Sequence, residues 1–189
     1  MYDSTTRRNI LKLLPLAGLS ALAPATARSQ APGSSARTLV AFFSRTGNTA
    51  LVARQIRRAR NATLFEIKVA RPYPEDYDET VAQAARETRE NYLPKLEYLV
   101  TDIRQYDEIY LGFPIWGMTA PPVIRSFLQG HDLSGTPVTP FITHGGYGLG
   151  DSLDVVRSLA PRSDVRQAFS MEADQERRTL KEVTGWLSR

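Results

Sequence analysis

The 189-residue chain contains no cysteine and only two histidines. Without cysteine it forms no disulfide, offers no thiol nucleophile and holds no Cys-ligated metal. The sequence also lacks a G-K-S or G-K-T tripeptide, which excludes a P-loop for nucleoside triphosphates. Basic residues do not alternate with aromatic ones in any run, which argues against nucleic-acid binding. These absences remove several common classes of enzyme and binding protein.

Long hydrophobic runs are scarce as well, and the N-terminal one has the features of an export signal. Arg7 and Arg8, with Ile10 where phenylalanine is usual, resemble the twin-arginine export motif. The apolar stretch that follows, residues 13–23, is interrupted by proline and glycine and is too short to span a bilayer comfortably. Residues 25–27 then have the small-x-small pattern of a cleavage site. An uncleaved anchor or a disordered tail is the alternative interpretation.

This pattern divides the chain into three parts. We expect a twin-arginine signal peptide over residues 1–27, a linker over 28–36 and one domain over 37–189. Export would place the domain in the periplasm, with no stable membrane insertion after processing. Removing residues 1–27 takes away three basic side chains and one acidic one, so the formal net charge falls from +4 to +2. The exported domain is therefore nearly neutral. Hydrophobic residues make up 42% of the whole chain, which is ordinary for a globular protein.

After the leader, short apolar runs alternate with segments of helical spacing. Strands followed by helices imply a parallel sheet covered on both faces, so the sequence predicts a three-layer α/β/α sandwich with a five-stranded parallel sheet. Ligands of such sheets bind at the carboxyl ends of the strands. The expected strands are residues 38–43, 62–68, 109–113, 137–143 and 165–169, and the expected helices are residues 49–60, 76–91, 121–128, 151–159 and 174–187.

The turn after the first strand has the composition of an anion site. Ser44, Thr46 and Thr49 supply hydroxyls, Asn48 supplies an amide, and Gly47 lets the backbone approach a ligand closely. Free N–H groups at the start of a helix surround a phosphate without needing a lysine. The alternative is an ordinary turn whose asparagine and threonine only cap the helix. The hydroxyl density favours a phosphate site.

Three motifs in order resemble the flavodoxin family. Residues 44–49 resemble the loop with which flavodoxins hold the 5′-phosphate of FMN. Residues 107–117 resemble the family's central strand and flavin loop, and residues 141–148 resemble the next strand and the second flavin loop. The similar region runs from about Arg37 to the C-terminus. The resemblance implies a flavodoxin-like fold and FMN as the cofactor.

The second motif provides a candidate for stacking on the flat isoalloxazine ring, which needs aromatic faces and backbone groups for its polar fringe. By resemblance, Trp116 is the stacking residue, with Pro114, Ile115 and Gly117 beside it in the flavin loop. Gly117 would let a peptide turn its carbonyl toward the flavin N5, because φ > 0 costs glycine little. Trp116 could instead pin this loop to the core.

The third motif provides a candidate residue to cover the second face of the isoalloxazine ring. Tyr147 lies between Gly146 and Gly148, and Thr143 and Gly145 complete the predicted site. A tyrosine among glycines can also be a solvated turn residue.

Two further residues are left open by the sequence. Arg45 either assists the phosphate or points outward while backbone amides hold the anion. His144 either approaches the flavin or is a solvated loop residue, and a lone histidine favours the second interpretation.

The function expected from the resemblance is electron transfer by an FMN protein that is exported already folded with its cofactor. Its partners would be redox proteins or a small-molecule electron acceptor, although the chain is not strongly acidic as electron-shuttling flavodoxins typically are. An FMN-dependent NAD(P)H:quinone oxidoreductase or related reductase is the enzymatic alternative. A domain that kept the fold without the flavin is the third.

Overall fold

The computed structural model describes residues 36–172 and 176–189. They form a five-stranded, fully parallel sheet of order β2-β1-β3-β4-β5, which confirms the predicted sheet. The predicted signal peptide, and the linker except for its last residue, lie outside the described residues. The strands are β1 (Thr38–Phe42), β2 (Thr63–Glu66), β3 (Glu108–Pro114), β4 (Val138–His144) and β5 (Phe169–Glu172).

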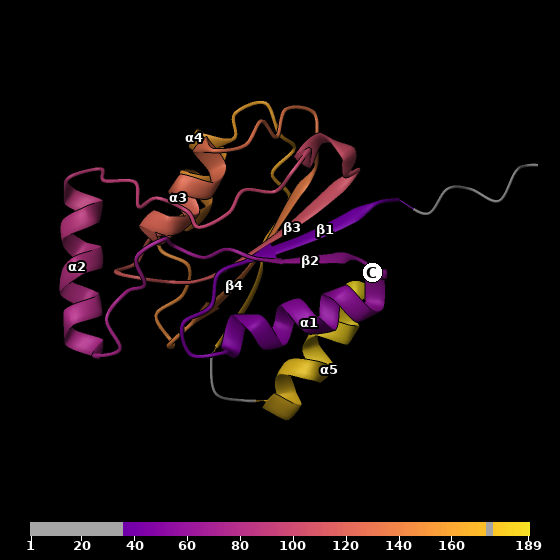
Figure 1. Ribbon diagram of the computed structural model, residues 1–189. Helices are drawn as coiled ribbons and strands as arrows, with labels where there is room; N and C mark the ends of the chain where they lie inside the picture. Colours follow the sequence, from indigo (N-terminus) through magenta and orange to yellow (C-terminus); the bar gives the residue numbers. More distant parts are fainter. Residues whose placement is uncertain (1–35, 173–175) are drawn as a thin grey trace, which may run out of the picture. The chain divides into compact units, whose positions relative to one another are not determined.

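Helices cover both faces of the sheet, as the predicted three-layer sandwich requires (Figure 1). One face carries α1 and α5, and the other carries α3 and α4. Among the described residues, no helix is long and apolar enough to cross a membrane. The helices are α1 (Asn48–Arg60), α2 (Tyr77–Arg89), α3 (Pro122–Gln129), α4 (Ser152–Leu159) and α5 (Glu176–Leu187), with a 3₁₀ turn, η1, at Ile103–Gln105.

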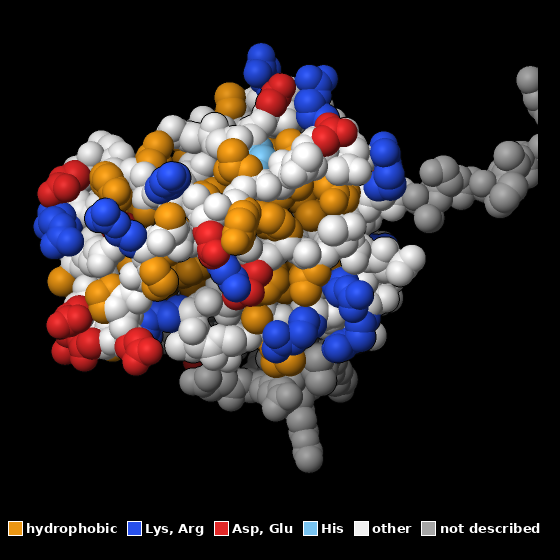
Figure 2. Space-filling model, in the orientation of Figure 1, with side chains coloured by type: hydrophobic (Ala, Val, Ile, Leu, Met, Phe, Trp, Pro, Cys, Tyr) orange, Lys and Arg blue, Asp and Glu red, His pale blue; other side chains and the backbone are white. Residues whose placement is uncertain are grey.

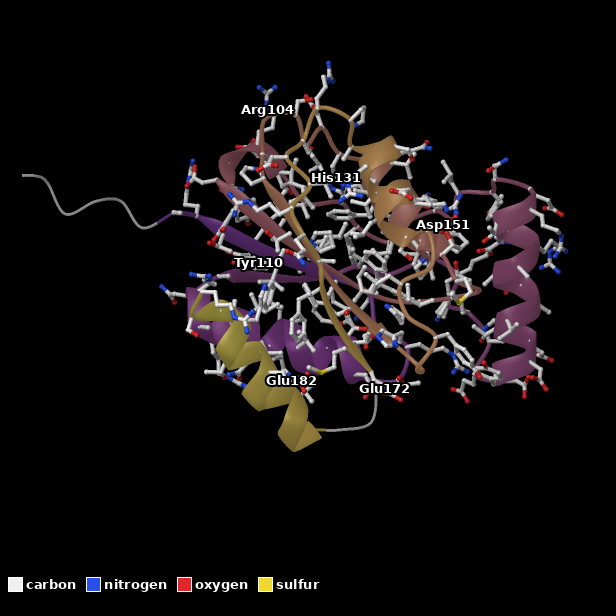
Figure 3. All side chains as sticks on the ribbon, turned by 180° about the vertical axis from the view of Figure 1, so that it is seen from behind. Arg104, Tyr110, His131, Asp151, Glu172 and Glu182 are labelled. Atoms are coloured by element: carbon white, nitrogen blue, oxygen red, sulfur yellow. The ribbon has the colours of Figure 1, made fainter. Side chains whose placement is uncertain are left out.

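Each central strand is buried on both sides because its side chains alternate between two cores. In β1, Leu39 and Ala41 pack with the α3/α4 core, whereas Val40 and Phe42 pack with the α1/α5 core. Figure 3 shows Tyr110 of β3 on the α5 side of the sheet. The period of two explains why these strands read as continuous apolar runs in the sequence.

One helix does not lie flat on the sheet. Figure 1 shows α2 standing beyond the carboxyl ends of the strands. Its first turn is capped by Asp76, whose Oδ1 accepts the Glu79 N–H at 2.9 Å. The Thr80 hydroxyl donates to the Pro74 carbonyl at 2.7 Å, so the start of α2 is tied to the loop before it. The position of α2 makes it a wall of the region where ligands of parallel sheets bind.

The predicted position of the fifth strand was wrong. Val165 forms only a single bridge to Val138, and regular pairing begins at Phe169. The Val138 N–H donates toward β5, to the Asp164 carbonyl at 2.9 Å. Two residues later Pro140 faces the same neighbour, but proline has no N–H to donate. The pairing is therefore interrupted at Pro140 and resumes in a register shifted by one residue.

Candidate functional site

The loop after β1 leads into α1 through a left-handed glycine. Gly47 is the N-cap of α1, has φ 92°, and contributes no side-chain cap. The Ser44 hydroxyl instead accepts the N–H groups of Gly47 at 3.2 Å and Ala50 at 3.3 Å. Neither Asn48 nor Thr49 occupies the N-cap position that the alternative interpretation gave them. The start of α1 therefore presents backbone and hydroxyl groups at the carboxyl edge of the sheet.

Three other polar residues of this loop have different surroundings. Thr46 and Asn48 line a cavity, and the Asn48 amide donates to the Thr46 hydroxyl at 3.3 Å. Thr49 is only 1% exposed, and its hydroxyl lies 2.8 Å from the Thr143 hydroxyl. Thr49 thus joins the first loop to the end of β4, whereas Thr46 and Asn48 face the cavity.

Arg45 points toward α2. Its Nη2 donates to the Glu75 carbonyl at 2.7 Å, and its guanidinium carbon lies 5.7 Å from the centre of the Tyr77 ring. This is a cation–π distance. Arg45 also lines the cavity, so its charge is close both to the first loop and to the start of α2.

The cavity has a volume of about 590 Å³ and lies where the three sequence motifs meet. This is within the range of roughly 300–1,000 Å³ that small-molecule sites occupy. We call its two sides the strand-loop wall and the α2 wall. The strand-loop wall comprises Thr46, Asn48, Pro114, Ile115, Trp116, Gly117, Thr119, Thr143, His144 and Gly145; the α2 wall comprises Tyr77, Thr80, Val81, Ala84, Ala85, Thr88 and Arg89.

Trp116 is half-buried and packs against two other aromatic rings. Its ring meets Phe43 edge-on, with centroids 5.2 Å apart and an interplanar angle of 85°. It meets Tyr73 in the same way at 4.9 Å and 88°. Such edge-to-face pairs fix the plane of a ring. Trp116 therefore packs on the core, as one interpretation of the sequence expected, and also lines the cavity.

The residues after Trp116 form a tight hairpin turn. Trp116 and Thr119 exchange backbone hydrogen bonds of 3.1 and 3.2 Å, and the two residues between them, Gly117 and Met118, have φ 57° and 64°. Positive φ at both central positions defines a type I′ turn. The Met118 carbonyl accepts the Asp151 N–H at 3.0 Å, which docks the turn on the start of α4, where Figure 3 labels Asp151.

The loop after β4 contributes less to the cavity than the sequence predicted. Thr143 and Gly145 line it, and so does His144, whose Nδ1 accepts the Gly146 N–H at 3.1 Å. Tyr147 is 83% exposed and is not among the lining residues, nor are Gly146 and Gly148. The second aromatic face expected from Tyr147 is thus not part of the cavity wall in this structure.

The α2 wall was missed by the sequence analysis. Its signal was present, because Tyr77, Val81, Ala85 and Thr88 recur at helical spacing. The buried face of the same helix comprises Thr80, Ala84 and Glu87, and two of these residues, Thr80 and Ala84, also line the cavity. Because small and polar residues occur on both faces, the sequence does not indicate which face meets a neighbouring element and which lines a pocket.

A tyrosine and a buried carboxylate connect the two walls. The Tyr73 hydroxyl donates to Glu87 Oε2 at 2.8 Å, and Gln83 Nε2 donates to Glu87 Oε1 at 2.8 Å. Glu87 is 5% exposed and takes part in none of the ion pairs formed within residues 36–172 and 176–189. Burial, together with the hydrogen bond to Glu87, raises the pKa of Tyr73 above its usual value. Since Tyr73 also contacts Trp116, α2 is linked to the aromatic residue of the strand-loop wall.

Other ligand types have less support. Within the described part of the chain, no group of three or more His, Asp or Glu side chains is placed to hold a metal ion. A separate cavity of about 510 Å³ lies between residues 128–134 and 159–163, away from all three motifs. The cavity between the strand-loop wall and the α2 wall is therefore the candidate site.

The flavodoxin family pattern matches residues 37–188, which is nearly the whole described chain. This chain belongs to the flavodoxin family. No curated protein matches it.

Solved structures agree with this family assignment. A Bacteroides eggerthii protein, described provisionally as a flavoprotein, is 30% identical, with 81% of this chain and 96% of that chain covered at a TM-score of 0.70. A similarly described Bacteroides uniformis protein is 28% identical, with coverages of 82% and 100% and a TM-score of 0.73. A Lactobacillus acidophilus flavoprotein, solved in complex with FMN, is 23% identical, with coverages of 82% and 99% and a TM-score of 0.66.

The cavity of this flavodoxin family member fits the two ends of FMN. At one end lie the N-terminus of α1, the Thr46 hydroxyl and Arg45, which together suit a phosphate. Away from that end, the half-buried ring of Trp116 suits a flat ring system. The cavity lining includes no Asp or Glu, so nothing acidic in it opposes a phosphate.

Proposed function

We propose that this flavodoxin family member is an FMN-binding electron-transfer protein. The observation that carries the proposal is that one cavity is lined both by residues at the start of α1, whose N-cap Gly47 has no side chain, and by the half-buried Trp116. The Lactobacillus acidophilus flavoprotein with bound FMN supports the choice of cofactor. Redox partner proteins or a small-molecule acceptor would complete the electron path.

FMN supplies the redox chemistry when it is bound, and the residues of the chain hold it and exclude water. Thr46, Asn48 and the backbone around Gly47 would bind the phosphate, while Thr49 and Thr143 brace the two loops through their hydroxyls. Trp116 would stack on the ring. The turn at Gly117 places backbone groups at the cavity, and its docking on Asp151 keeps them in place.

FMN titration of the purified apoprotein tests the proposal. We expect bound FMN to quench Trp116 fluorescence and the visible spectrum of FMN to shift, with one FMN per chain. The loaded protein should then accept electrons from dithionite and return them to an added oxidant. Absence of saturable FMN binding would reject the proposed function.

We also propose that the protein works in the periplasm after twin-arginine export. The support is the motif around Arg7 and Arg8 together with a non-covalent cofactor, because this route generally moves folded proteins. Changing Arg7 and Arg8 to lysine together should leave an unprocessed precursor in the cytoplasm, as measured by cell fractionation. Unchanged periplasmic delivery of the double variant would reject the twin-arginine route. That result would not bear on the proposal that the protein binds FMN.

A further inference from the structure

The α2 helix has two different faces. Thr80, Ala84 and Glu87 are buried and form the face that packs on the protein, and Thr80 and Ala84 also reach the cavity lining. Val81 is 49% exposed although it is apolar, and it lines the cavity together with Ala85. The second face therefore keeps apolar side chains accessible inside a cavity, at a position that none of the three flavodoxin motifs includes.

This wall is fixed relative to Trp116. The hydrogen bond from Tyr73 to Glu87 ties the C-terminal half of α2 to a ring that packs 4.9 Å from Trp116. At the other end of the helix, Arg45 bonds to the Glu75 carbonyl and lies over Tyr77. Both ends of α2 are thus anchored to residues that contact or line the cavity, so the space between Trp116 and α2 is defined by the fold.

The charges along the cavity have one sign. Its titratable side chains other than Tyr77 are Arg45, His144 and Arg89, and it contains no carboxylate. At about 1.5 Å per residue, Arg89 lies about 18 Å along α2 from Tyr77, where Arg45 is placed. Arg45 is beside the phosphate end, whereas Arg89 is at the far end. Figure 2 shows acidic side chains grouped at one end of α2 and basic ones nearer the other, which agrees with its acidic first turn and basic last turn.

We propose that the α2 wall binds the electron acceptor, and that this acceptor is a planar aromatic quinone with an anionic substituent. Val81 and Ala85 would contact the flat apolar rings, and Arg89 would pair with the anionic group. The quinone would accept two electrons and one proton from the anionic reduced FMN and a second proton from water, forming the hydroquinone as FMN is reoxidised. The inference rests on the proposed function and goes beyond it by naming the class of the acceptor and its binding residues.

The test uses FMN-loaded protein and 1,4-naphthoquinone-2-sulfonate. After anaerobic reduction with dithionite and removal of the excess, reoxidation is followed by stopped-flow absorbance at increasing quinone concentration. We expect the rate to saturate. We also expect the quinone to perturb the visible spectrum of the oxidised, FMN-loaded protein with the same half-saturation, which measures binding without turnover.

Two matched pairs of variants locate the binding surface. Val81→Glu should raise the half-saturating quinone concentration about tenfold, because it removes an apolar contact and adds a like charge, whereas Ala82→Glu, on the next exposed residue outside the cavity, should change it less than twofold. Arg89→Gln should raise the half-saturating quinone concentration about fivefold, a modest effect because an exposed charge pair contributes little binding energy. Arg86→Gln, outside the cavity, should raise it less than twofold. All four variants should keep the FMN affinity of the unmodified protein.

The outcomes separate this inference from the proposed function. Hexaammineruthenium(III), a cation with no flat face, should reoxidise every variant at least as fast as the unmodified protein, because the substitutions only make the cavity less positive. If the quinone rate rises linearly without saturation and is the same in every variant, the α2 wall is not an acceptor site, and FMN-based electron transfer stands. If Val81→Glu loses FMN and Ala82→Glu does not, the wall contacts the flavin itself and the inference is overturned. If the unmodified protein binds no FMN, both proposals fail.

Discussion

The two walls of the cavity are built on different principles. The strand-loop wall consists mainly of short loops at the ends of strands, and its geometry depends on backbone conformation at Gly47, Gly117 and Met118. The α2 wall consists of side chains on a regular helix that stands beyond the sheet. The first wall needs particular residue types at particular positions, so it leaves a motif in the sequence. The second needs only small and apolar residues at helical spacing.

The difference suggests a division of roles. Backbone groups and hydroxyls of the strand-loop wall suit a fixed, charged cofactor, while the apolar α2 wall suits a ligand that comes and goes. Trp116, Tyr73 and Glu87 form the connection between them. Substitutions in one wall, in the other and in this connection should therefore have separable effects.

Loss of Trp116 should have the largest effect on FMN affinity. Trp116→Ala removes the main aromatic contact of the strand-loop wall, and we expect the free energy of FMN binding to weaken by about 2–3 kcal/mol, or roughly 30- to 150-fold in Kd. Fluorescence titration and calorimetry of the apoprotein measure this. The midpoint potential of bound flavin should also rise, because a stacked electron-rich ring disfavours the anionic reduced flavin.

Trp186 provides the control for the fluorescence. It packs between Phe169 and Tyr110 on the opposite face of the sheet, at 4.8 and 5.7 Å between ring centroids. Trp186→Phe should therefore keep the FMN-dependent quenching that Trp116→Ala abolishes. If quenching and potential are unchanged in Trp116→Ala, Trp116 is only a packing residue and the flavin binds elsewhere.

Removing the hydrogen bond between Tyr73 and Glu87, which links the two walls, should mainly affect stability. Tyr73→Phe keeps the ring against Trp116 but removes a hydrogen bond to the buried Glu87 carboxylate, so we expect the free energy of unfolding to fall by about 1.5–3 kcal/mol. Urea denaturation measures it, with Tyr98→Phe as the control because Tyr98 is exposed.

The pH dependence of this loss has a defined sign. Because burial raises the pKa of Tyr73 above the ordinary value of 10.0, the unfolded chain loses the phenolic proton at a pH where the native protein keeps it. The stabilisation from Tyr73 is therefore complete below pH 10 and decreases above it. The gap between the unmodified protein and Tyr73→Phe should narrow above that pH. A constant gap would show that the native protein does not hold the pKa of Tyr73 above its ordinary value.

Most of the fold follows from the sequence, and the exception depends on pairing between two strands. Burial on two faces makes the central strands apolar runs, and helical spacing between them implies the parallel sandwich. The fifth strand was misplaced because its position depends on a residue in another strand. Pro140 of β4 cannot donate to β5, and nothing in residues 165–169 themselves indicates this.

The candidate site was only partly predictable for a related reason. Thr46, Asn48 and Trp116 lie in loops, and Thr143 near the end of β4, in segments whose composition indicates a binding site, and all four line the cavity. The burial of Thr49 against Thr143, and the positions of Arg45 over Tyr77 and of Tyr147 in solvent, depend on contacts between distant segments. Chemistry that resides in one short segment can be recognised from the sequence, but the surroundings of that segment require the fold.

Removing a single hydroxyl should have a smaller effect on FMN affinity, and the effect should differ between the strand-loop wall and the α2 wall. Thr46→Ala removes a group at the phosphate end, and we expect a loss of about 1.5 kcal/mol in FMN binding, close to tenfold in Kd. Thr88→Ala, the matched change in the α2 wall, should leave FMN affinity within twofold.

Riboflavin, which lacks the phosphate, is the second control for Thr46. It should bind the unmodified protein more weakly than FMN does, and Thr46→Ala should not weaken it further. Equal affinities of the unmodified protein for FMN and riboflavin would show that this loop holds no phosphate.

The smallest expected effect is a gain in stability from relaxing the turn at Met118. Met118 has φ 64°, which is costly for a residue with an unbranched apolar side chain, and 46% of it is exposed, so its packing contributes little. Asparagine adopts this conformation more readily and does not increase the flexibility of the unfolded chain as glycine would. Met118→Asn should therefore raise the free energy of unfolding of the apoprotein by about 0.5 kcal/mol, as measured by urea denaturation. The carbonyl of residue 118 should keep its bond to Asp151, and the α2 wall should be unaffected, so quinone half-saturation should not change. A loss of stability would mean that the Met118 side chain, rather than the backbone of the turn, holds this part of the strand-loop wall in place.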